Sequence, residues 1–176
     1  MRKEKVEIRD YRAPLQYGPA FKLDEYDKRL LHELDQNARS SLIELSKKVG
    51  LSPDAIRNRI QKMVENKVIL AFTPIYNPPA LGYPTINYVF ISLYNPNEKQ
   101  EKELIAFLQS HKNITYIASL IGKWDFILDI MAQNPGEFDK ILKEIRQKFP
   151  DLIKDYEVYG VLQEYKYEEI GKLVHD

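Results

Sequence analysis

The sequence predicts an α+β protein in which a helical N-terminal part is joined to a C-terminal part built of strands and helices. Residues 23–72 repeat apolar side chains at helical spacing, residues 73–84 are rich in proline, and residues 85–167 twice follow a strand-like apolar run with the pattern Asn-Pro-x-Glu. We therefore expect an irregular N-terminal arm over residues 1–22, a helical domain, a linker, a mixed domain and a C-terminal tail over residues 168–176.

Three helices are expected in the N-terminal part. The first begins at Leu23-Asp24 and ends near Asn37, because its apolar residues recur every three or four positions. Ser40-Ser41 offers an N-cap to a short second helix, and Gly50 ends that helix. A third helix then begins with Ser52 as its N-cap and proline at its first position. This order is typical of a helix-turn-helix, either simple or winged.

The third predicted helix has an apolar face, formed by Ile56, Ile60, Met63 and Val64, and a polar outer face. Asparagine and glutamine can bond adenine edges in a major groove, and arginine can reach guanine or phosphate. On this interpretation the side chains directed toward a groove are Arg57, Asn58, Gln61 and Lys62. A polar outer face is also ordinary on a protein that binds no DNA, so spacing alone leaves both interpretations open.

The C-terminal part contains an internal repeat. The apolar run over residues 88–94 is followed by Asn95-Pro96-Asn97-Glu98, and the run over residues 126–132 is followed by Asn134-Pro135-Gly136-Glu137. In each tetrapeptide we expect the first asparagine to cap a helix and the proline to take its first position. Further strands are expected over residues 114–121 and 153–162. The order is that of a ferredoxin-like βαββαβ domain, with a hairpin at residues 122–125.

The first strand of this domain carries apolar residues on both of its faces. Val89 and Ile91 alternate with Tyr88 and Phe90, and two helices can cover only one face of a four-stranded sheet. We therefore expect a second copy of the chain to cover the open face, which makes the protein a homodimer.

Composition excludes several classes of protein. The chain has 176 residues and no cysteine, so thiolate catalysis and cysteine-ligated metals are excluded. The three histidines are far apart in sequence, and we expect no metal and no cofactor. No apolar run approaches the roughly 20 residues of a membrane span and no signal peptide is evident, so we expect a soluble, cytoplasmic protein. Net charge is zero, but residues 1–72 hold 15 basic against 11 acidic side chains, which fits a DNA-contacting half.

At the helix-turn-helix residues the chain resembles the Lrp/AsnC (feast/famine) transcriptional regulators. The matching positions include Leu23-Asp24, Asn37-Ala38-Arg39, Val49-Gly50-Leu51-Ser52 and Arg59-Ile60. The βαββαβ half is similar to the effector-binding and oligomerising domain of that family, with Gly122-x-x-Asp125 at its hairpin. The resemblance covers about residues 23–167.

The resemblance implies a dimeric, often octameric, regulator that binds double-stranded DNA and senses a small molecule, commonly an amino acid. It implies no enzymatic activity. The effector site would include Gly122, Lys123, Trp124 and Asp125. Arg39 and Arg59 match family positions near DNA or at the helix interface. The DNA-binding candidates are therefore Arg39, Ser41, Ser52, Asp54, Arg57, Asn58, Arg59, Gln61 and Lys62.

The chain departs from the family pattern at two positions, and two other functions remain open. Lys67 stands where the family usually has glycine after the recognition helix, and Lys123 stands where an acidic residue is common. One alternative is an enzyme similar to siroheme decarboxylases, which share the fold and use histidine and arginine near the hairpin. Residues 117–130 hold neither residue type, only Lys123, which argues against that enzyme. The other alternative is a sensing or interaction protein that does not bind DNA.

Overall fold

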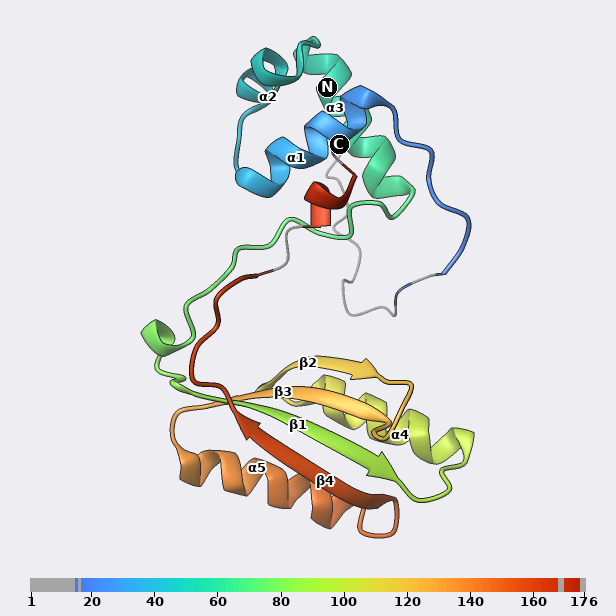
Figure 1. Ribbon diagram of the computed structural model, residues 1–176, viewed down its shortest axis with the longest axis vertical. Helices are drawn as coiled ribbons and strands as arrows, with labels where there is room; N and C mark the ends of the chain where they lie inside the picture. The colour runs from blue at the N-terminus through green and yellow to red at the C-terminus, as the bar shows by residue number, and fades with distance from the viewer. Residues whose placement is uncertain (1–14, 16, 168–169, 175–176) are drawn as a thin grey trace, which may run out of the picture. The chain divides into compact units, whose positions relative to one another are not determined.

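The computed structural model describes residues 15, 17–167 and 170–174, which form two compact units (Figure 1). One unit comprises the described residues up to Pro74 together with those from Lys166 onward, and the other comprises residues 75–165. The elements are α1 (Glu25–Gln36), α2 (Leu42–Val49), α3 (Pro53–Glu65), η1 (Pro79–Leu81), β1 (Thr85–Leu93), α4 (Glu98–Ser110), β2 (Ile114–Ser119), β3 (Phe126–Ala132), α5 (Pro135–Lys148), β4 (Ile153–Gly160) and η2 (Ile170–Leu173).

The three N-terminal helices begin at side-chain caps. Asp24 caps α1 and Ser41 caps α2, each in a reciprocal capping box with the residue three positions later. Ser52 caps α3, which has Pro53 in its first turn, and Gly50 ends α2 in the left-handed conformation with φ 83°. The caps predicted at Ser41 and Ser52 and the terminator predicted at Gly50 are therefore confirmed.

The helices enclose a small apolar core. Leu30 of α1, Leu45 of α2, and Ile56 and Met63 of α3 are buried in it. Ile60 and Val64, which the spacing also placed on the inner face of α3, are half-buried. Because each helix contributes a stripe to one core, the outer face of α3 is fixed relative to α1 and α2.

After α3 the chain turns at Lys67. This residue has a left-handed φ of 60°, a conformation that glycine adopts at less steric cost than lysine. The turn therefore has a backbone conformation suited to glycine, although the residue there is lysine.

The C-terminal unit is a four-stranded antiparallel sheet in the order β2-β3-β1-β4, with α4 and α5 connecting the strands. The strands of the first half of the repeat, β1 and β2, therefore alternate across the sheet with those of the second half, β3 and β4. This is the ferredoxin-like arrangement that the βαββαβ order predicts.

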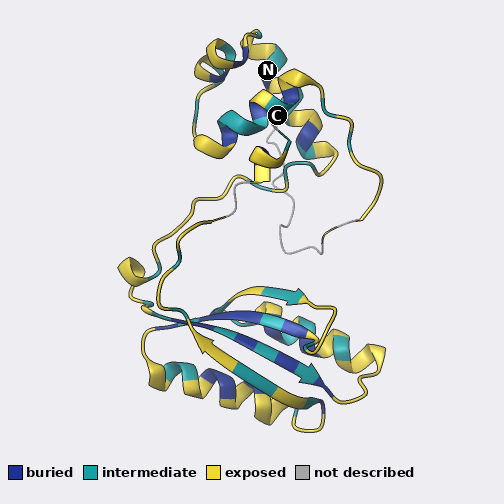
Figure 2. Ribbon diagram, in the orientation of Figure 1, coloured by how far each residue is buried: buried dark blue, intermediate teal, exposed yellow. Residues whose placement is uncertain are grey.

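Buried and half-buried residues alternate along most of β1 (Figure 2), so the two faces of the sheet differ in burial. Val89 and Ile91 lie in one core with Leu104 of α4 and Ile145 of α5, so both helices cover this face. Tyr88 and Phe90, on the opposite face of β1, are only half-buried. This agrees with the prediction that the strand carries apolar residues on both of its faces.

The capping prediction holds for α5 and is wrong for α4. Asn134 caps α5 with proline in its first turn. In contrast, α4 is capped by Asn97, two residues beyond the predicted Asn95, because Asn97 and Gln100 form a capping box. Asn95 instead takes a left-handed turn with φ 41°. The strands also differ at their ends, since β2 stops at Ser119 and β4 stops at Gly160.

Several expectations concern segments without regular structure. Residues 17–24 form neither helix nor strand, while residues 1–14 and 16 of the expected arm lie outside the described residues. In the described part of the chain, no helix combines the length and apolar character of a membrane span. The same residues contain no cluster of three acidic or histidine side chains suited to a metal ion.

Candidate functional site

The turn between α2 and α3 is built from local hydrogen bonds. The Ser46 hydroxyl donates to the carbonyl of Leu51, and the Ser52 hydroxyl accepts from the backbone of Ala55 at 3.2 Å. These bonds fix the start of α3, where helical N–H groups without intrahelical partners create a partial positive charge. The serines predicted to contact DNA, Ser41 and Ser52, are thus first of all helix caps.

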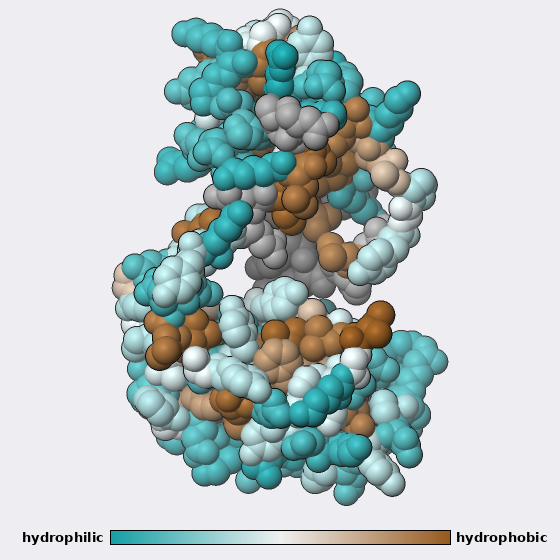
Figure 3. Space-filling view, viewed as in Figure 1, coloured by the Kyte–Doolittle hydropathy of each residue, from teal (hydrophilic) through white to brown (hydrophobic). Residues whose placement is uncertain are grey.

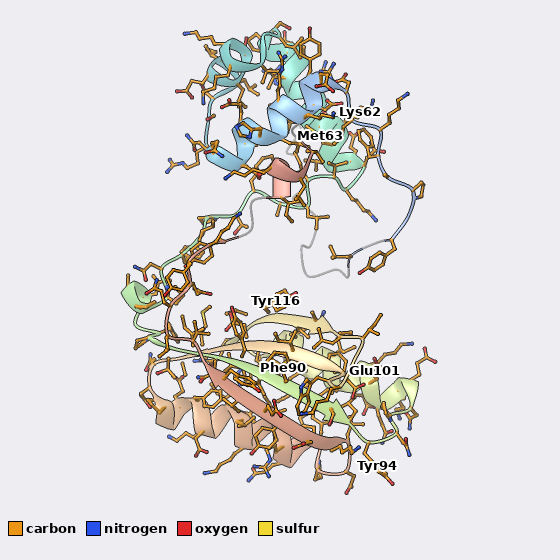
Figure 4. All side chains as sticks on the ribbon, viewed as in Figure 1. Lys62, Met63, Phe90, Tyr94, Glu101 and Tyr116 are labelled. Atoms are coloured by element: carbon orange, nitrogen blue, oxygen red, sulfur yellow. The ribbon has the colours of Figure 1, made fainter. Side chains whose placement is uncertain are left out.

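The outer face of α3 is polar and exposed. Asn58, Gln61 and Lys62 are exposed, whereas Met63 beside them is buried in the helical core (Figure 4). Gln61 Nε2 donates to Glu65 Oε1 at 2.9 Å, and the Lys62 ammonium lies 5.4 Å from the centre of the Phe21 ring. Within the described residues no hydrogen bond or ion pair uses the Asn58 amide. Asn58 therefore presents a donor and an acceptor to any approaching molecule.

Arg59 joins α3 to the start of α1. Its Nη1 lies 2.8 Å from Asp24 Oδ2 and 2.7 Å from Asp27 Oδ1, and Asp27 is buried. Burial disfavours the charge of Arg59, but the two carboxylates outweigh that effect and raise its pKa. Of the two locations implied for Arg59, DNA or the helix interface, the structure places it at the interface.

The other charged candidates lie on the surface. Arg57 and Asp54 form an ion pair at 2.5 Å within α3, so part of each charge is neutralised. Arg39 is exposed before α2, and its backbone N–H donates to Asn37 Oδ1 at 3.0 Å. The nine residues named for DNA contact therefore lie on α3, in the turn that precedes α2 or in the turn between α2 and α3, and Arg59 is the one held by two carboxylates.

The hairpin candidates lie in the other unit, between β2 and β3. Asp125 bonds β1 twice, because its Oδ2 accepts from the Leu93 N–H at 2.7 Å and its own N–H donates to the Ile91 carbonyl at 2.9 Å. Gly122, with φ 150°, lies in the turn. Asp125 therefore anchors the hairpin to the end of β1.

Lys123 and Trp124 belong to a charged and aromatic cluster on the open face of the sheet. The Lys123 ammonium lies 4.3 Å from the centre of the Trp124 ring and 2.9 Å from Glu157 Oε1. Hydrogen bonds from Tyr159 and from Lys123 lower the pKa of the Glu157 carboxyl, and Glu157 raises the pKa of Lys123. The charge of Lys123 is therefore balanced by a residue of β4.

Phe90 connects this cluster across the sheet. Its ring centre is 6.4 Å from that of Trp124 and 5.6 Å from that of Tyr159, which stands edge-on to it. Sequence reasoning missed Glu157, because its position depends on the pairing of Glu157 with Phe90 across β4 and β1.

Apolar side chains are exposed on the surface of this unit, among hydrophilic ones (Figure 3).

Asp129 is a buried carboxylate on the same face of the sheet, since it pairs with Tyr88 across β3 and β1. Its Oδ2 accepts from the Thr115 hydroxyl at 3.0 Å, and no described residue bonds its buried Oδ1. Burial raises the pKa of Asp129, the Thr115 hydrogen bond opposes the rise, and the charge of Glu164 adds to it.

Comparison with known proteins gives the same two domains. Residues 23–64 match the AsnC-type helix-turn-helix domain, and residues 87–170 match the Lrp/AsnC ligand binding domain. A leucine-responsive regulatory protein of Haemophilus influenzae is 31% identical over 82% of this chain and 86% of its own length. The solved structure of E. coli AsnC has a TM-score of 0.74 and 26% identity, and the match covers 86% of this chain and 99% of that one.

A second solved structure, a Neisseria meningitidis transcriptional regulator in complex with L-Met, has a TM-score of 0.75. It is 19% identical, with 83% of this chain and 94% of that chain covered, so it supports the fold. The two domains define a transcriptional regulator that joins a DNA-binding helix-turn-helix to a ligand-binding domain. The chain belongs to the Lrp/AsnC family.

Proposed function

We propose that α3 is the recognition helix of this regulator and reads bases in a major groove. The observation that carries this proposal is the exposed Asn58 amide, which no other described residue engages, at the centre of a polar helix face. Asparagine can bond adenine through two hydrogen bonds. Gln61 and Lys62 flank it on the exposed side of α3, so one helical face supplies both base-edge and phosphate contacts.

Phosphate contacts would come from exposed cations and from helix N-termini. Arg39 is exposed before α2, and the capped starts of α2 and α3 present backbone N–H groups. Arg57 is paired with Asp54 in the protein without DNA, and its guanidinium can exchange that carboxylate for a phosphate. We assign Arg59 to holding α3 in place, because two carboxylates engage it.

Selection of genomic fragments by the purified protein tests this role. The protein is incubated with sheared DNA and excess non-specific competitor, and retained fragments are sequenced. A dimer is expected to enrich a two-fold symmetric site whose half-sites lie about 34–36 Å apart, which is one helical turn. Failure of folded, dimeric protein to enrich any sequence would contradict the proposal and favour a sensor that does not bind DNA.

We infer that a second copy of the chain covers the open face of the sheet. On that face Tyr116 and Tyr159 are each about half exposed, at 51% and 53%, and Phe90 is half-buried (Figure 4). Aromatic side chains of this kind are enriched at the buried centres of interfaces. A two-fold axis through this face would give each DNA-binding helix a partner related by symmetry.

Sedimentation of two variants tests the dimer. Tyr116→Glu places a charge on the open face and is expected to shift the protein toward a monomer. The matched control, Gln147→Glu, places the same charge on an exposed position of α5, on the covered side of the sheet, and is expected to leave the dimer intact. Equal behaviour of the two variants would contradict this interface. The wild-type run also reports assembly beyond the dimer.

We propose that the cluster of Lys123, Trp124 and Glu157 contacts a small-molecule effector with both charges of an amino acid. A lysine and a carboxylate 2.9 Å apart could pair with an α-carboxylate and an α-ammonium. One relative is named as leucine-responsive and one structural neighbour holds L-Met, so these amino acids are the first probes. Such a regulator acts in the cytoplasm, without catalysing a reaction.

The fluorescence of Trp124 reports this binding directly, because it is the only tryptophan of the chain. Titration with leucine, methionine and the other amino acids is expected to give a saturable change for at least one of them. Lys123→Ala is expected to weaken that response, and Lys140→Ala on α5 serves as the control. A panel that changes neither the fluorescence nor the melting temperature would contradict an amino-acid effector.

A further inference from the structure

The chain returns to the helical unit after it has completed the sheet. β4 ends at Gly160, the described residues from Lys166 onward group with the N-terminal helices, and η2 contacts α1. Figure 1 shows the short red turn of η2 beside α1. The DNA-binding unit is therefore joined to the sheet unit at two places in the sequence, after Pro74 and before Lys166.

The contact between η2 and α1 depends on a buried glycine. Gly171 is buried although it lies in a short turn near the end of the chain. A Cβ atom at this position would overlap the carboxylate of Asp35 and lie 3.0 Å from the Leu31 carbonyl oxygen. Both contacts are with α1, so the absence of a side chain allows the tail to approach this helix closely.

Charge and apolar burial contribute little to this contact. The last turn of α1 carries Glu33 and Asp35 and no basic residue, but Glu33 is paired with Lys48 of α2 at 2.6 Å. The tail has charges of both signs in its sequence, with Lys166 and Lys172 against Glu168, Glu169 and Asp176. Ile170 and Leu173 of η2 are 62% and 80% exposed, so the close approach at Gly171 defines the contact.

We propose that α1 is the docking surface for residues 170–174 of the same chain, and that this contact couples β4 to the DNA-binding domain. β4 carries Glu157 and Tyr159 of the hairpin cluster, so the tail extends from the strand that lines the proposed effector site. A second attachment narrows the range of positions open to a tethered domain. The consequence for regulation rests on the proposed function, but the contact and the restriction can be measured without DNA or effector.

Distance measurements between the two units test the restriction. The chain contains no cysteine, so cysteines introduced at exposed Lys47 of α2 and Lys140 of α5 can carry spin labels. Labelled protein is diluted with an excess of unlabelled protein, so that distances within one chain dominate. Hydrogen exchange of the last turn of α1 is followed in the same samples, with β1 as an internal reference for folding.

Gly171→Val is expected to displace η2, speed exchange in the last turn of α1 several-fold and widen the distance distribution. Gly171→Ala is expected to produce a smaller change in the same direction. Leu173→Ala alters an exposed side chain of the same turn and is expected to leave both measurements unchanged. If α1 exchange is the same in Gly171→Val and wild type, α1 is not the docking surface.

If Gly171→Val speeds hydrogen exchange in α1 but leaves the distance distribution between the two labels unaltered, the tail does not couple β4 to the DNA-binding domain. Loss of wild-type α1 protection upon dilution to monomer would place the tail on a partner chain and overturn docking within one chain. Because no DNA is present, a failed DNA selection would contradict the proposed function while leaving this result unaffected.

Discussion

At the scale of single residues, Asp125, a candidate for ligand contact, also anchors its hairpin to β1 through hydrogen bonds. Its carboxylate accepts the Leu93 N–H at 2.7 Å, and Leu93 is buried at the end of β1. A ligand that displaced this carboxylate would leave a backbone donor without a partner. In the proposed effector site we therefore expect Asp125 to hold Lys123 and Trp124 in place, while those side chains and Glu157 contact the ligand.

Replacing Asp125 with alanine is expected to lower the free energy of unfolding by about 1–3 kcal/mol, because the Leu93 N–H loses its acceptor. Asp125→Asn retains an oxygen acceptor and is expected to cost less. Chemical denaturation of the three proteins gives the comparison. If alanine costs no more than asparagine, the carboxylate does not anchor the hairpin.

Asp129 is expected to lower stability at neutral pH. Its raised pKa means that the folded state binds the proton more tightly than the unfolded state, so stability falls as pH rises from 3.8 through the folded pKa. Asp129→Asn is expected to stabilise the protein on the order of 1 kcal/mol at pH 7, with the gain vanishing in acid. Asp151→Asn, at an exposed site, is the control. A gain independent of pH would contradict this account.

At the scale of elements, α3, the proposed recognition helix, is held by charge as well as by its apolar stripe. Ile56 and Met63 bury one face of α3, while Arg59 bonds Asp24 and Asp27 at the beginning of α1. Both interactions keep the outer face of α3 directed outward. A regulator needs this rigidity, because base recognition depends on the position of a few side chains.

Arg59→Ala is expected to destabilise the helical unit by about 2–3 kcal/mol, because Asp27 would remain buried without its cation. Burial acts to raise the pKa of Asp24, but its bonds to Asp27 and Arg59 lower it below 3.8. The pair of Arg59 with Asp24 therefore stabilises the fold above pH 3.8. Its contribution disappears as pH falls through the folded pKa of Asp24. Denaturation of both proteins between pH 2 and 7 measures the difference, which would be constant if Arg59 acted through packing alone.

The sequence predicts these elements well where the signals are local. Ser41, Ser52 and Asn134 cap helices as their neighbours indicate. Asn97 was missed because two asparagines compete for one cap, and the choice depends on the reciprocal bond in which the Asn97 N–H donates to Gln100 Oε1. Glu157 and Gly171 were missed because their contacts follow from strand register and from the return of the chain, which no local pattern contains.

At the scale of the whole molecule, the proposed function requires two DNA-binding units, one from each copy of the expected dimer. If the dimer neutralises about six phosphates, the logarithm of the affinity should fall with the logarithm of salt concentration at a slope near −5. Arg39→Ala is expected to reduce this slope by about two in a dimer and to weaken all DNA sequences alike. Titrations at several salt concentrations measure the slope. A flat response would contradict phosphate contacts.

The most direct measurement of the central claim is a DNA selection repeated with Asn58→Ala. If the exposed face of α3 reads bases, the variant should lose preference at one position in each half-site, at a cost of about 1–3 kcal/mol there, and keep the half-site spacing. Gln147→Ala, at an exposed position on α5 of the other unit, is the control for the selection. The same selected sequence with wild type and Asn58→Ala, or a uniform loss on every sequence, would contradict base reading by this residue.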